Sequence, residues 1–281
     1  MIAFKLYREF GALNSPPIFD AFQQGVLHTG NRIVDANEDV AVIWSVLWNG
    51  RMQGNQQVYE YRRKRNLPTI IIEVGNLIRN QTWRIGLNNV NALGQFGNKN
   101  DLDLTRPKKL GVGLKSPKKH RKSEILIAGQ HEASLQWQGQ PSMQSWVTAT
   151  VNEIKKHTDR SIKFRPHPRA RYGTSYQIKD VVMERPQLLP GTYDSFNFDY
   201  SYHCVVNYNA GPSVQSAING CPVICDLSSL AYPVSGKMSE IDNIALPDRE
   251  DWFLKLCHTE WTTDEIARGE PLSRIIPLLN C

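Results

Sequence analysis

The sequence predicts an α/β protein made of two doubly wound units that face a cleft. In both halves of the 281-residue chain, segments typical of strands alternate with segments typical of helices, a pattern that indicates parallel sheets. Between the halves, residues 88–122 change to a composition rich in Gly, Asn and Lys, which is typical of loops and linkers. We therefore expect one unit at 1–118 and a second at 119–260, with residues 261–281 as helices that pack back on the first unit.

The first half contains three expected strands and two expected helices. The strands are rich in β-branched and aromatic residues and lie at 2–7, 40–48 and 69–75. Ser15 precedes two prolines and predicts the N-cap of the first helix, because proline suits the first helical turn. The second helix is expected at 54–66 and ends in the basic run RRKR.

The second half repeats the alternation. Its strands are expected at 124–130, 161–168, 204–211 and 221–226. Its helices are expected at 141–158, 212–220, 249–261 and 262–269. The first of these helices is capped near Ser142, and Pro212 suits the first turn of the second.

The composition is that of a water-soluble globular protein, with 41% hydrophobic residues and a mean hydropathy of −0.42. The longest apolar run, VAVIWSVLW, is too short to span a bilayer, and MIAFKLYREF lacks the apolar core of a signal peptide. We therefore expect a cytoplasmic protein without a membrane span. The five cysteines are scattered and form no CxxC pair, which favours buried, reduced thiols over a zinc site or a disulfide framework.

The positive charge is concentrated in the first part of the chain. Residues 1–120 contain 17 Lys and Arg against 9 Asp and Glu, whereas residues 121–281 contain 16 against 18. This asymmetry indicates that the first half faces an anionic partner. The alternative is a solvated basic face that aids solubility.

Three expected strands of the second half end in polar or glycine-rich sequence. Gln130 closes the first, His167 stands between two prolines after the second, and Asn209 to Gly211 follow the third. Open parallel sheets bind ligands at the carboxyl ends of their strands. We therefore expect these three ends to meet at one pocket.

The chemistry expected there is anion binding. Gly211 leads straight into a helix, whose first N–H groups and dipole attract anions. Arg165, Arg169 and Arg171 surround His167, and His167 together with Arg165 and Arg169 would complete a phosphate cradle. The alternatives are a structural histidine and an ordinary helix cap.

The order of these motifs resembles the C-terminal half of GT-B glycosyltransferases over residues 124–270. The stretch NYNAGPSVQSAINGCPVI is similar to the loop and helix that grip the donor diphosphate and ribose, and WFLKLCHTEWTTDEIARGEP resembles the terminal helices of the capsule-polysaccharide group. Small phage-encoded sugar transferases are also similar. The resemblance implies two Rossmann-like domains, an N-terminal one for the acceptor and a C-terminal one for a nucleotide sugar.

The resemblance also implies the donor-site residues. They are Gln130, Arg165, His167, Arg169, Asn209, Gly211, Ser213 and Gln215. Ala210 and Gly211 stand where the capsule group has a Ser/Thr pair, so hydroxyl contacts to phosphate would come from Ser213 or be replaced by backbone N–H groups. Gln215 stands where many relatives have an acidic ribose partner. The expected co-substrate is a UDP-sugar, with no obligatory cofactor and a divalent metal as an optional addition.

A transferase of this kind needs a group that takes the proton of the acceptor hydroxyl. Glu73 ends the strand 69–75 and is the expected catalytic base, with Asp20 as its rival. A structural carboxylate is the alternative for Glu73. His28 is a further candidate to face the cleft. Three tryptophans would either stack on a sugar or be buried in the core, namely Trp44, Trp48 and Trp83.

Two basic runs suggest the acceptor, since each could track a phosphate backbone. Their expected nucleic-acid contacts are Arg62, Arg63, Lys64, Arg65, Lys118, Lys119, Arg121 and Lys122. With the likeness to phage enzymes, they imply a hexosyltransferase that moves glucose from UDP-glucose to a base such as hydroxymethylcytosine, flipped out of double-stranded DNA in a bacteriophage-infected cell. The alternatives are transfer to a surface polysaccharide or lipid-linked glycan, and a non-catalytic nucleic-acid-binding protein with the same shell.

Overall fold

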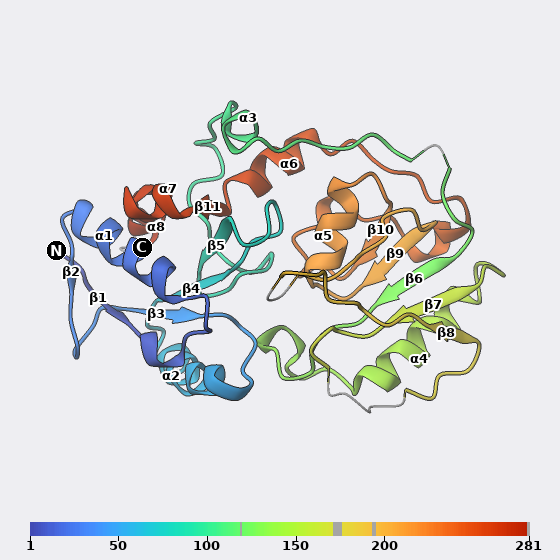
Figure 1. Ribbon diagram of the computed structural model, residues 1–281, viewed down its shortest axis with the longest axis horizontal. Helices are drawn as coiled ribbons and strands as arrows, with labels where there is room; N and C mark the ends of the chain where they lie inside the picture. Colours follow the sequence, from blue (N-terminus) through green and yellow to red (C-terminus); the bar gives the residue numbers. More distant parts are fainter. Residues whose placement is uncertain (119, 171–175, 193–194, 280–281) are drawn as a thin grey trace. The chain divides into compact units, whose positions relative to one another are not determined.

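The computed structural model describes residues 1–118, 120–170, 176–192 and 195–279. The chain folds as two compact units, one formed by Met1–Val112 with Leu254–Cys281 and the other by Gly113–Phe253. Each unit is built around its own sheet (Figure 1). The α/β class expected from the alternating pattern is therefore confirmed.

The sheet of the first unit has six strands in the order β11-β5-β4-β3-β1-β2. The strands are β1 (Ala3–Leu6), β2 (Arg32–Ile33), β3 (Val40–Trp44), β4 (Thr69–Val74), β5 (Thr82–Leu87) and β11 (Glu260–Thr262). The four strands from β4 to β2 are parallel, whereas β5 is antiparallel to both of its neighbours. β3 is buried along its whole length, as expected of a central strand in a sheet that is covered on both faces.

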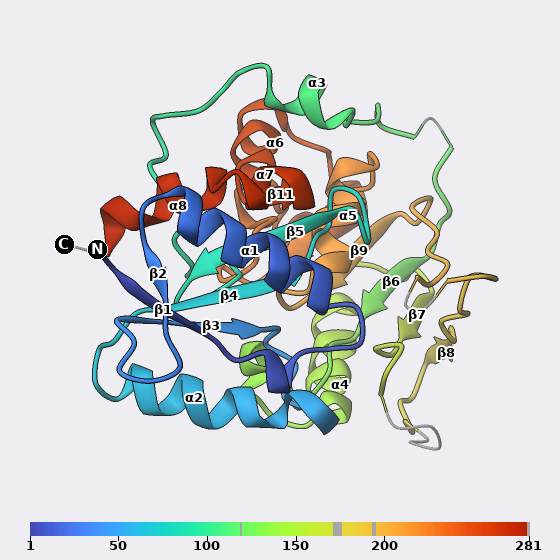
Figure 2. The same ribbon diagram turned by 60° about the vertical axis from the view of Figure 1, so that its left-hand side comes forward.

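Helices cover both faces of this sheet. One face carries α1 (Pro16–His28), α7 (Thr263–Ala267) and α8 (Glu270–Ile275), and the other carries α2 (Gly54–Arg63), as Figure 2 shows. Short 3-10 helices lie at Arg8–Phe10, Gly50–Gln53 and Ile276–Leu278. α7 comes close to α1 at Gly25, where an added Cβ would lie 2.2 Å from the backbone oxygen of Ile266. This approach buries Ile266 in the same core as Phe22 of α1.

The sheet of the second unit has five parallel strands in the order β10-β9-β6-β7-β8. The strands are β6 (Ile125–Ala128), β7 (Ile162–Arg165), β8 (Val181–Met183), β9 (Cys204–Asn207) and β10 (Val223–Cys225). α4 (Met143–Ile154) covers one face and places Val147 in the same buried core as Ile125 and Ile127, and α5 (Gly211–Ile218) covers the other face (Figure 1). Short 3-10 helices lie at Leu135–Trp137, Tyr232–Val234 and Met238–Asn243, and α6 (Glu250–Cys257) leads from the second unit into the first.

The expected helix starts are largely confirmed. The Ser142 hydroxyl accepts a hydrogen bond from the Ser145 N–H at 3.2 Å and caps α4, and Pro212 lies in the first turn of α5. Ser15 precedes α1 as expected, but its hydroxyl does not cap the helix. It donates instead to the backbone oxygen of Ala12 at 2.8 Å.

Three strands of the first sheet, β2, β5 and β11, were not predicted from the sequence. The helix expected at 249–261 ends at Cys257, and β11 follows it as a strand that places Trp261 opposite Trp83 of β5. The expectation of a purely parallel sheet is therefore wrong at this edge. The carboxylate of Glu260 is fully buried there and accepts hydrogen bonds from the Thr82 hydroxyl at 2.9 Å and the Arg84 guanidinium at 3.3 Å.

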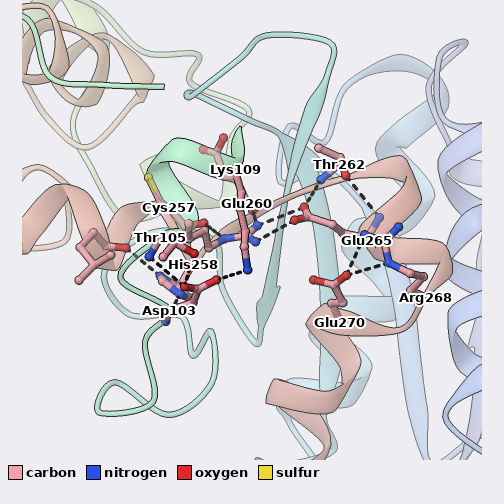
Figure 3. A network of polar contacts seen from close by, with 12 residues as sticks. Asp103, Thr105, Lys109, Cys257, His258, Glu260, Thr262, Glu265, Arg268 and Glu270 are labelled. Atoms are coloured by element: carbon pink, nitrogen blue, oxygen red, sulfur yellow. Dashed lines mark hydrogen bonds and ion pairs between the residues drawn. The ribbon is translucent and has the colours of Figure 1, made fainter. Parts of the chain in front are cut away.

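The basic run at 106–122, expected as a linker or mobile loop, begins with a helix, α3 (Arg106–Leu110). Arg106 is buried and stacks over the Trp261 ring at 4.0 Å. Its guanidinium donates to the backbone oxygens of Cys257 and Glu260 at 2.5 and 2.6 Å, and pairs with the Glu265 carboxylate at 2.8 Å. This network, seen in Figure 3, fastens β11 and α7 to α3 within the first unit.

Four cysteines are free thiols, of which Cys204, Cys221 and Cys257 are buried and Cys225 is partly buried. The prediction of reduced thiols is confirmed for these four, and Cys281 lies outside the described residues. Within the described ranges, no helix is long and apolar enough to cross a bilayer. The His, Cys, Asp and Glu side chains of the same ranges form no group of three or more that could hold a metal ion.

Candidate anion-binding site at the carboxyl edge of the second sheet

The three polar strand ends of the second unit lie next to one another. β9, β6 and β7 are neighbours in the sheet, and Ala128 at the end of β6 lies opposite both Asn207 and Arg165. Because the strands are parallel and in register, their carboxyl ends are level. The three strand ends therefore lie side by side at one edge of the sheet, and the common pocket expected there stays a prediction.

Hydrogen bonds tie the segments that leave these strands. The Gly129 N–H donates to the Arg165 backbone oxygen at 2.8 Å, and the Asn207 side chain donates to the Ala128 backbone oxygen at 2.7 Å. The Asn209 N–H donates to Oε1 of Gln130 at a longer 3.4 Å. These contacts hold the loops after β6, β7 and β9 together at one edge.

The N-terminus of α5 points its first backbone N–H groups out of this edge. Its N-cap, Ala210, has extended backbone angles and no side chain caps the helix. The Ala210 N–H itself is satisfied by Oδ1 of Asn207 at 2.8 Å. An uncapped helix N-terminus with its positive dipole end is suited to bind an anion.

Two buried amides beside this helix start have unsatisfied atoms. Gln130 is 5% exposed and Asn209 is 6% exposed. Within the part of the chain that the structure describes, neither Nε2 of Gln130 nor Oδ1 of Asn209 has a hydrogen-bond partner. A buried polar atom without a partner costs about 1–3 kcal/mol, so a ligand that pairs with both amides would remove this cost. Nε2 of Gln130 is thus a hydrogen-bond donor, and Oδ1 of Asn209 an acceptor, that a polar ligand at this edge could satisfy.

A second histidine, His131, accompanies His167. The two rings lie edge to face with centroids 5.3 Å apart. The Arg169 N–H donates to Nδ1 of His167 at 3.1 Å, which makes Nε2 the protonated nitrogen of the neutral ring. His131 bonds the backbone of Arg169, and burial lowers its pKa. Arg169 is exposed beside them, and Arg171 lies outside the described residues.

His131 was not among the predicted site residues, although its position in the sequence carries a signal. It directly follows Gly129 and Gln130 at the end of β6, and the rule that placed ligands at strand ends applies to it equally. Its contact with His167 depends on the order of β6 and β7 in the sheet, which sequence spacing does not show.

Arg165 does not offer its charge to a ligand. It is 5% exposed, and its guanidinium pairs with Glu184 at 3.1 Å. It also donates to the backbone and side chain of Asn197 and lies over the Phe198 ring at 5.1 Å. The expected role of Arg165 in a phosphate cradle is therefore replaced by that of an anchor for the segment around 184–198.

The hydroxyl of Ser213 is also engaged within the protein. Ser213 is fully buried, donates to the Ala210 backbone oxygen at 2.9 Å and lies 3.1 Å from Oγ of Ser229. The expectation that it contacts phosphate is wrong for this geometry, which leaves the backbone N–H groups. Oε1 of Gln215 accepts from the Tyr200 hydroxyl at 3.1 Å, so its amide is held beside the loop that precedes β9.

The two expected catalytic carboxylates lie in the first unit in different surroundings. Glu73 is partly buried in β4 and accepts from the Ser45 hydroxyl at 2.8 Å, the Val46 N–H at 3.2 Å and the Val74 N–H at 2.9 Å. Ser45 has a φ of 65°, so Glu73 also secures a left-handed turn at the end of β3. Asp20 lies on α1, 63% exposed, and pairs with Arg8 at 2.7 Å.

The other aromatic and basic candidates of the first half have more ordinary places. The three tryptophans are buried, at 2%, 5% and 4% exposure for Trp44, Trp48 and Trp83, so the alternative of core residues is confirmed. His28 is exposed at the end of α1. These side chains carry no further argument for a sugar site.

The basic runs are only partly available to a partner. Arg62 is 2% exposed and pairs with Glu38 at 3.0 Å, so its expected contact with a phosphate backbone is wrong. Lys122 pairs with Asp199 at 2.7 Å, a contact that raises the lysine pKa. Exposed side chains in the runs are Arg63, Lys64, Arg65, Lys118, Arg121 and Lys122, and Lys119 lies outside the described residues.

Comparisons with known proteins identify the fold. No protein-family model and no curated protein matches the sequence. Among solved structures, the KpsC β-Kdo 2,4 transferase of Thermosulfurimonas dismutans is similar with a TM-score of 0.51 at 12% identity, over 91% of this chain and 89% of that chain. This likeness confirms the expected GT-B-like fold, and at such identity it shows the fold alone.

Two further structures are similar at lower scores. The KpsC β-Kdo 2,7 transferase of the same organism has a TM-score of 0.47 at 11% identity, over 96% of this chain and 98% of that chain. An S. aureus MnaA–UDP co-structure has a TM-score of 0.32 at 12% identity, over 100% of this chain and 97% of that chain. Scores at this level carry no argument about function.

Proposed function

We propose that the protein is a glycosyltransferase whose nucleotide-sugar donor binds at the carboxyl edge of the second sheet. The observation that carries this proposal is the pair of buried, unsatisfied amide atoms of Gln130 and Asn209 beside the uncapped start of α5. A diphosphate suits the helix start, and a base or sugar edge with both a donor and an acceptor suits the two amides. The GT-B-like fold supports the same reading.

In this proposal the second unit stabilises the leaving group. The backbone N–H groups of α5 and the Nε2–H of His167 contact the diphosphate, and the exposed Arg169 adds positive charge. His131 positions His167 through ring contact and its bond to the backbone of Arg169. When the bond between the anomeric carbon and the phosphate oxygen breaks, the electron pair stays on that oxygen, whose charge these donors stabilise.

The acceptor hydroxyl forms the new bond to the anomeric carbon and loses its proton to a base. We propose Glu73 for this step over Asp20, because Asp20 is a solvent-exposed partner of Arg8. An ionised carboxylate offers about four acceptor positions. The Ser45 hydroxyl and the Val46 and Val74 N–H groups use three of them, which leaves one for the substrate hydroxyl.

For the acceptor we favour a saccharide, such as a surface polysaccharide or a lipid-linked glycan, over hydroxymethylated DNA. The structure with a TM-score of 0.51 is a Kdo transferase. In addition, the buried Arg62 removes one cation from the basic run that suggested DNA. The exposed Arg63, Lys64 and Arg65 support an anionic acceptor of either kind.

The donor proposal is tested by calorimetric titration of the whole protein with UDP, GDP and CMP and with the corresponding nucleotide sugars. We expect one nucleotide series to bind, and Gln130→Ala to weaken its binding. Gln138→Ala is the matched control, because Gln138 is an exposed amide in the same loop. If no nucleotide binds, or if the two variants behave alike, the donor site is refuted.

The acceptor proposal is tested with the nucleotide sugar that binds. Transfer of its labelled sugar is measured to oligosaccharides, to hydroxymethylated duplex DNA and to unmodified DNA. Transfer to the modified duplex alone would contradict the saccharide acceptor and support the DNA reading. Salt-sensitive DNA binding without any nucleotide-sugar binding would instead support a non-catalytic nucleic-acid-binding protein.

A further inference from the structure

A polar cavity lies at the opposite edge of the second sheet, where the strands begin. Its volume is about 490 Å³, and its lining includes Arg121, Lys122, Arg160, His203, Asp242 and Asn243. Arg121 and Lys122 precede β6, Arg160 precedes β7 and His203 precedes β9. Since these strands are parallel, the cavity lies at their amino ends, away from the proposed donor site.

Hydrogen bonds and one ion pair connect the segments that line this cavity. The Lys122 N–H donates to the Ser201 oxygen at 2.7 Å, and the His203 N–H donates to the Glu124 oxygen at 2.9 Å. The Arg160 guanidinium pairs with Asp242 at 3.0 Å and donates to the Ser123 oxygen at 3.4 Å. The segments before three strands are thus joined into one wall.

Arg121 is the unusual member of this wall. Its guanidinium donates to the backbone oxygens of His203 at 2.8 Å and Ile244 at 3.5 Å, both of which are neutral. In the described ranges no carboxylate lies within ion-pair distance of it. The positive charge is therefore fixed by the backbone and left uncompensated, and three of its five N–H donors remain for a ligand.

The other ionisable side chains of the lining are paired or neutral, so they leave the charge of Arg121 in excess. Lys122 is paired with Asp199, and Arg160 is paired with Asp242. His203 donates from Nε2 to the Ile241 oxygen at 2.7 Å, and burial lowers its pKa, so it contributes no charge at neutral pH. Arg121 is thus the lining cation without a carboxylate partner in the described ranges, and this single excess charge favours an anionic occupant.

We propose that this cavity binds an anionic saccharide unit, a sugar that carries a carboxylate or a phosphate group. The anionic group pairs with Arg121. The sugar hydroxyls are recognised by Asn243 and by Asp242, which is 49% exposed and whose contacts with Thr158 and Arg160 both use Oδ1, leaving Oδ2 as an acceptor. A volume of about 490 Å³ is in the range of small-ligand sites. This inference is independent of the proposed donor site, because the two lie at opposite ends of the strands.

The test compares Arg121→Gln with Lys118→Gln in the whole protein. Both variants remove one positive charge from the same exposed basic run, but Lys118 does not line the cavity. Binding of glucose 6-phosphate, tetragalacturonate, neutral maltotetraose, inorganic phosphate and a short DNA duplex is measured by calorimetry at low salt. We expect one of the two acidic sugars to bind, and Arg121→Gln to weaken that binding about tenfold or more, as the loss of a charged hydrogen bond predicts. Lys118→Gln should change it less than about twofold.

The outcomes separate the possibilities. Tighter binding of the phosphorylated or of the carboxylated probe identifies the anionic group, and equal weakening by both variants would refute the site as general charge attraction. Inorganic phosphate that binds as tightly as glucose 6-phosphate would refute the sugar contacts. Arg121-dependent binding of DNA alone would refute the saccharide and favour a nucleic acid. Hydrogen exchange of the β6 and β9 peptides shows whether Arg121→Gln leaves the unit folded, and Asp242→Asn supplies an independent variant of the sugar contacts.

Discussion

Replacing Gln130 by methionine should stabilise the unliganded second unit and weaken nucleotide binding at the same time. The change removes Nε2, a buried donor without a partner among the described residues, and so relieves about 1–3 kcal/mol. It also removes the acceptor of the Asn209 N–H, but at 3.4 Å that bond is longer than the usual 2.9–3.0 Å and its loss costs at most about 1 kcal/mol. Since methionine has a similar volume, little cavity forms, and the net gain lies between about 0 and 3 kcal/mol.

The same substitution removes one hydrogen bond to the donor nucleotide. Such a bond contributes about 0.5–1.5 kcal/mol, which corresponds to an affinity loss of about 2- to 10-fold. Opposite signs for stability and affinity are characteristic of a binding residue whose polar atom is unsatisfied in the free protein. If Gln130 had only a structural role, its substitution would lower the stability of the second unit and leave the nucleotide affinity unchanged.

The assay is hydrogen exchange of peptides from β6 and β9 with and without nucleotide, since a protein of two units need not unfold in one step. Slower exchange of the free variant and a weaker nucleotide effect are the expected pair of results. Gln138→Met serves as the control, because Gln138 is exposed. Faster exchange in free Gln130→Met, with full nucleotide affinity, would refute the reasoning.

Three other predictions concern separate parts of the chain. His167→Ala should lower nucleotide affinity about tenfold without changing DNA affinity, whereas His157→Ala beyond α4 should change neither; equal losses of both affinities would contradict the assignment. Arg106→Leu leaves the Glu265 carboxylate without its cation and should destabilise the first unit by about 3–5 kcal/mol. The measurement is hydrogen exchange of the β5 and β11 peptides, which should become faster, whereas loss of the exposed Lys109 side chain should have little effect. Burial lowers the pKa of His258, whose Nε2 accepts the Asp103 N–H at 2.9 Å, so the unfolded chain takes up a proton first as the pH falls. The free energy of unfolding of the first unit should therefore decrease below about pH 6.5, and His258→Gln should remove that decrease; an unchanged pH profile would show that His258 is not its cause.

Much of the architecture could be predicted from local pattern. β-branched runs located β3 and β4, and the alternation with helices indicated the parallel sheet of the second unit, because strand and helix periods are properties of consecutive residues. β11 could not be predicted in this way. Its three residues continue a helix-like sequence, and only pairing with β5, which brings Trp261 opposite Trp83, makes an extended backbone favourable there.

The candidate site shows the same division. The rule that ligands bind at strand ends led to His167, Asn209 and Gln130, and these residues do meet at one edge. The rule could not show that Arg165 forms an ion pair with Glu184, or that Arg62 forms one with Glu38. Whether a basic side chain is offered to a ligand depends on which carboxylate the fold brings to it, and such partners lie far away in the chain.

The sequence by itself determined the α/β class, the helix and strand periods and the polar ends of the strands of the second unit, because these follow from neighbouring residues. The tertiary structure alone decided which of the many charged and amide side chains remain unsatisfied. Most of these side chains form hydrogen bonds or ion pairs with distant segments of the chain. A buried polar atom that has no partner raises the free energy of the folded protein. Among the described residues, the atoms left without a partner include Nε2 of Gln130 and Oδ1 of Asn209, and Arg121 has no carboxylate partner; the proposals rest on these three side chains.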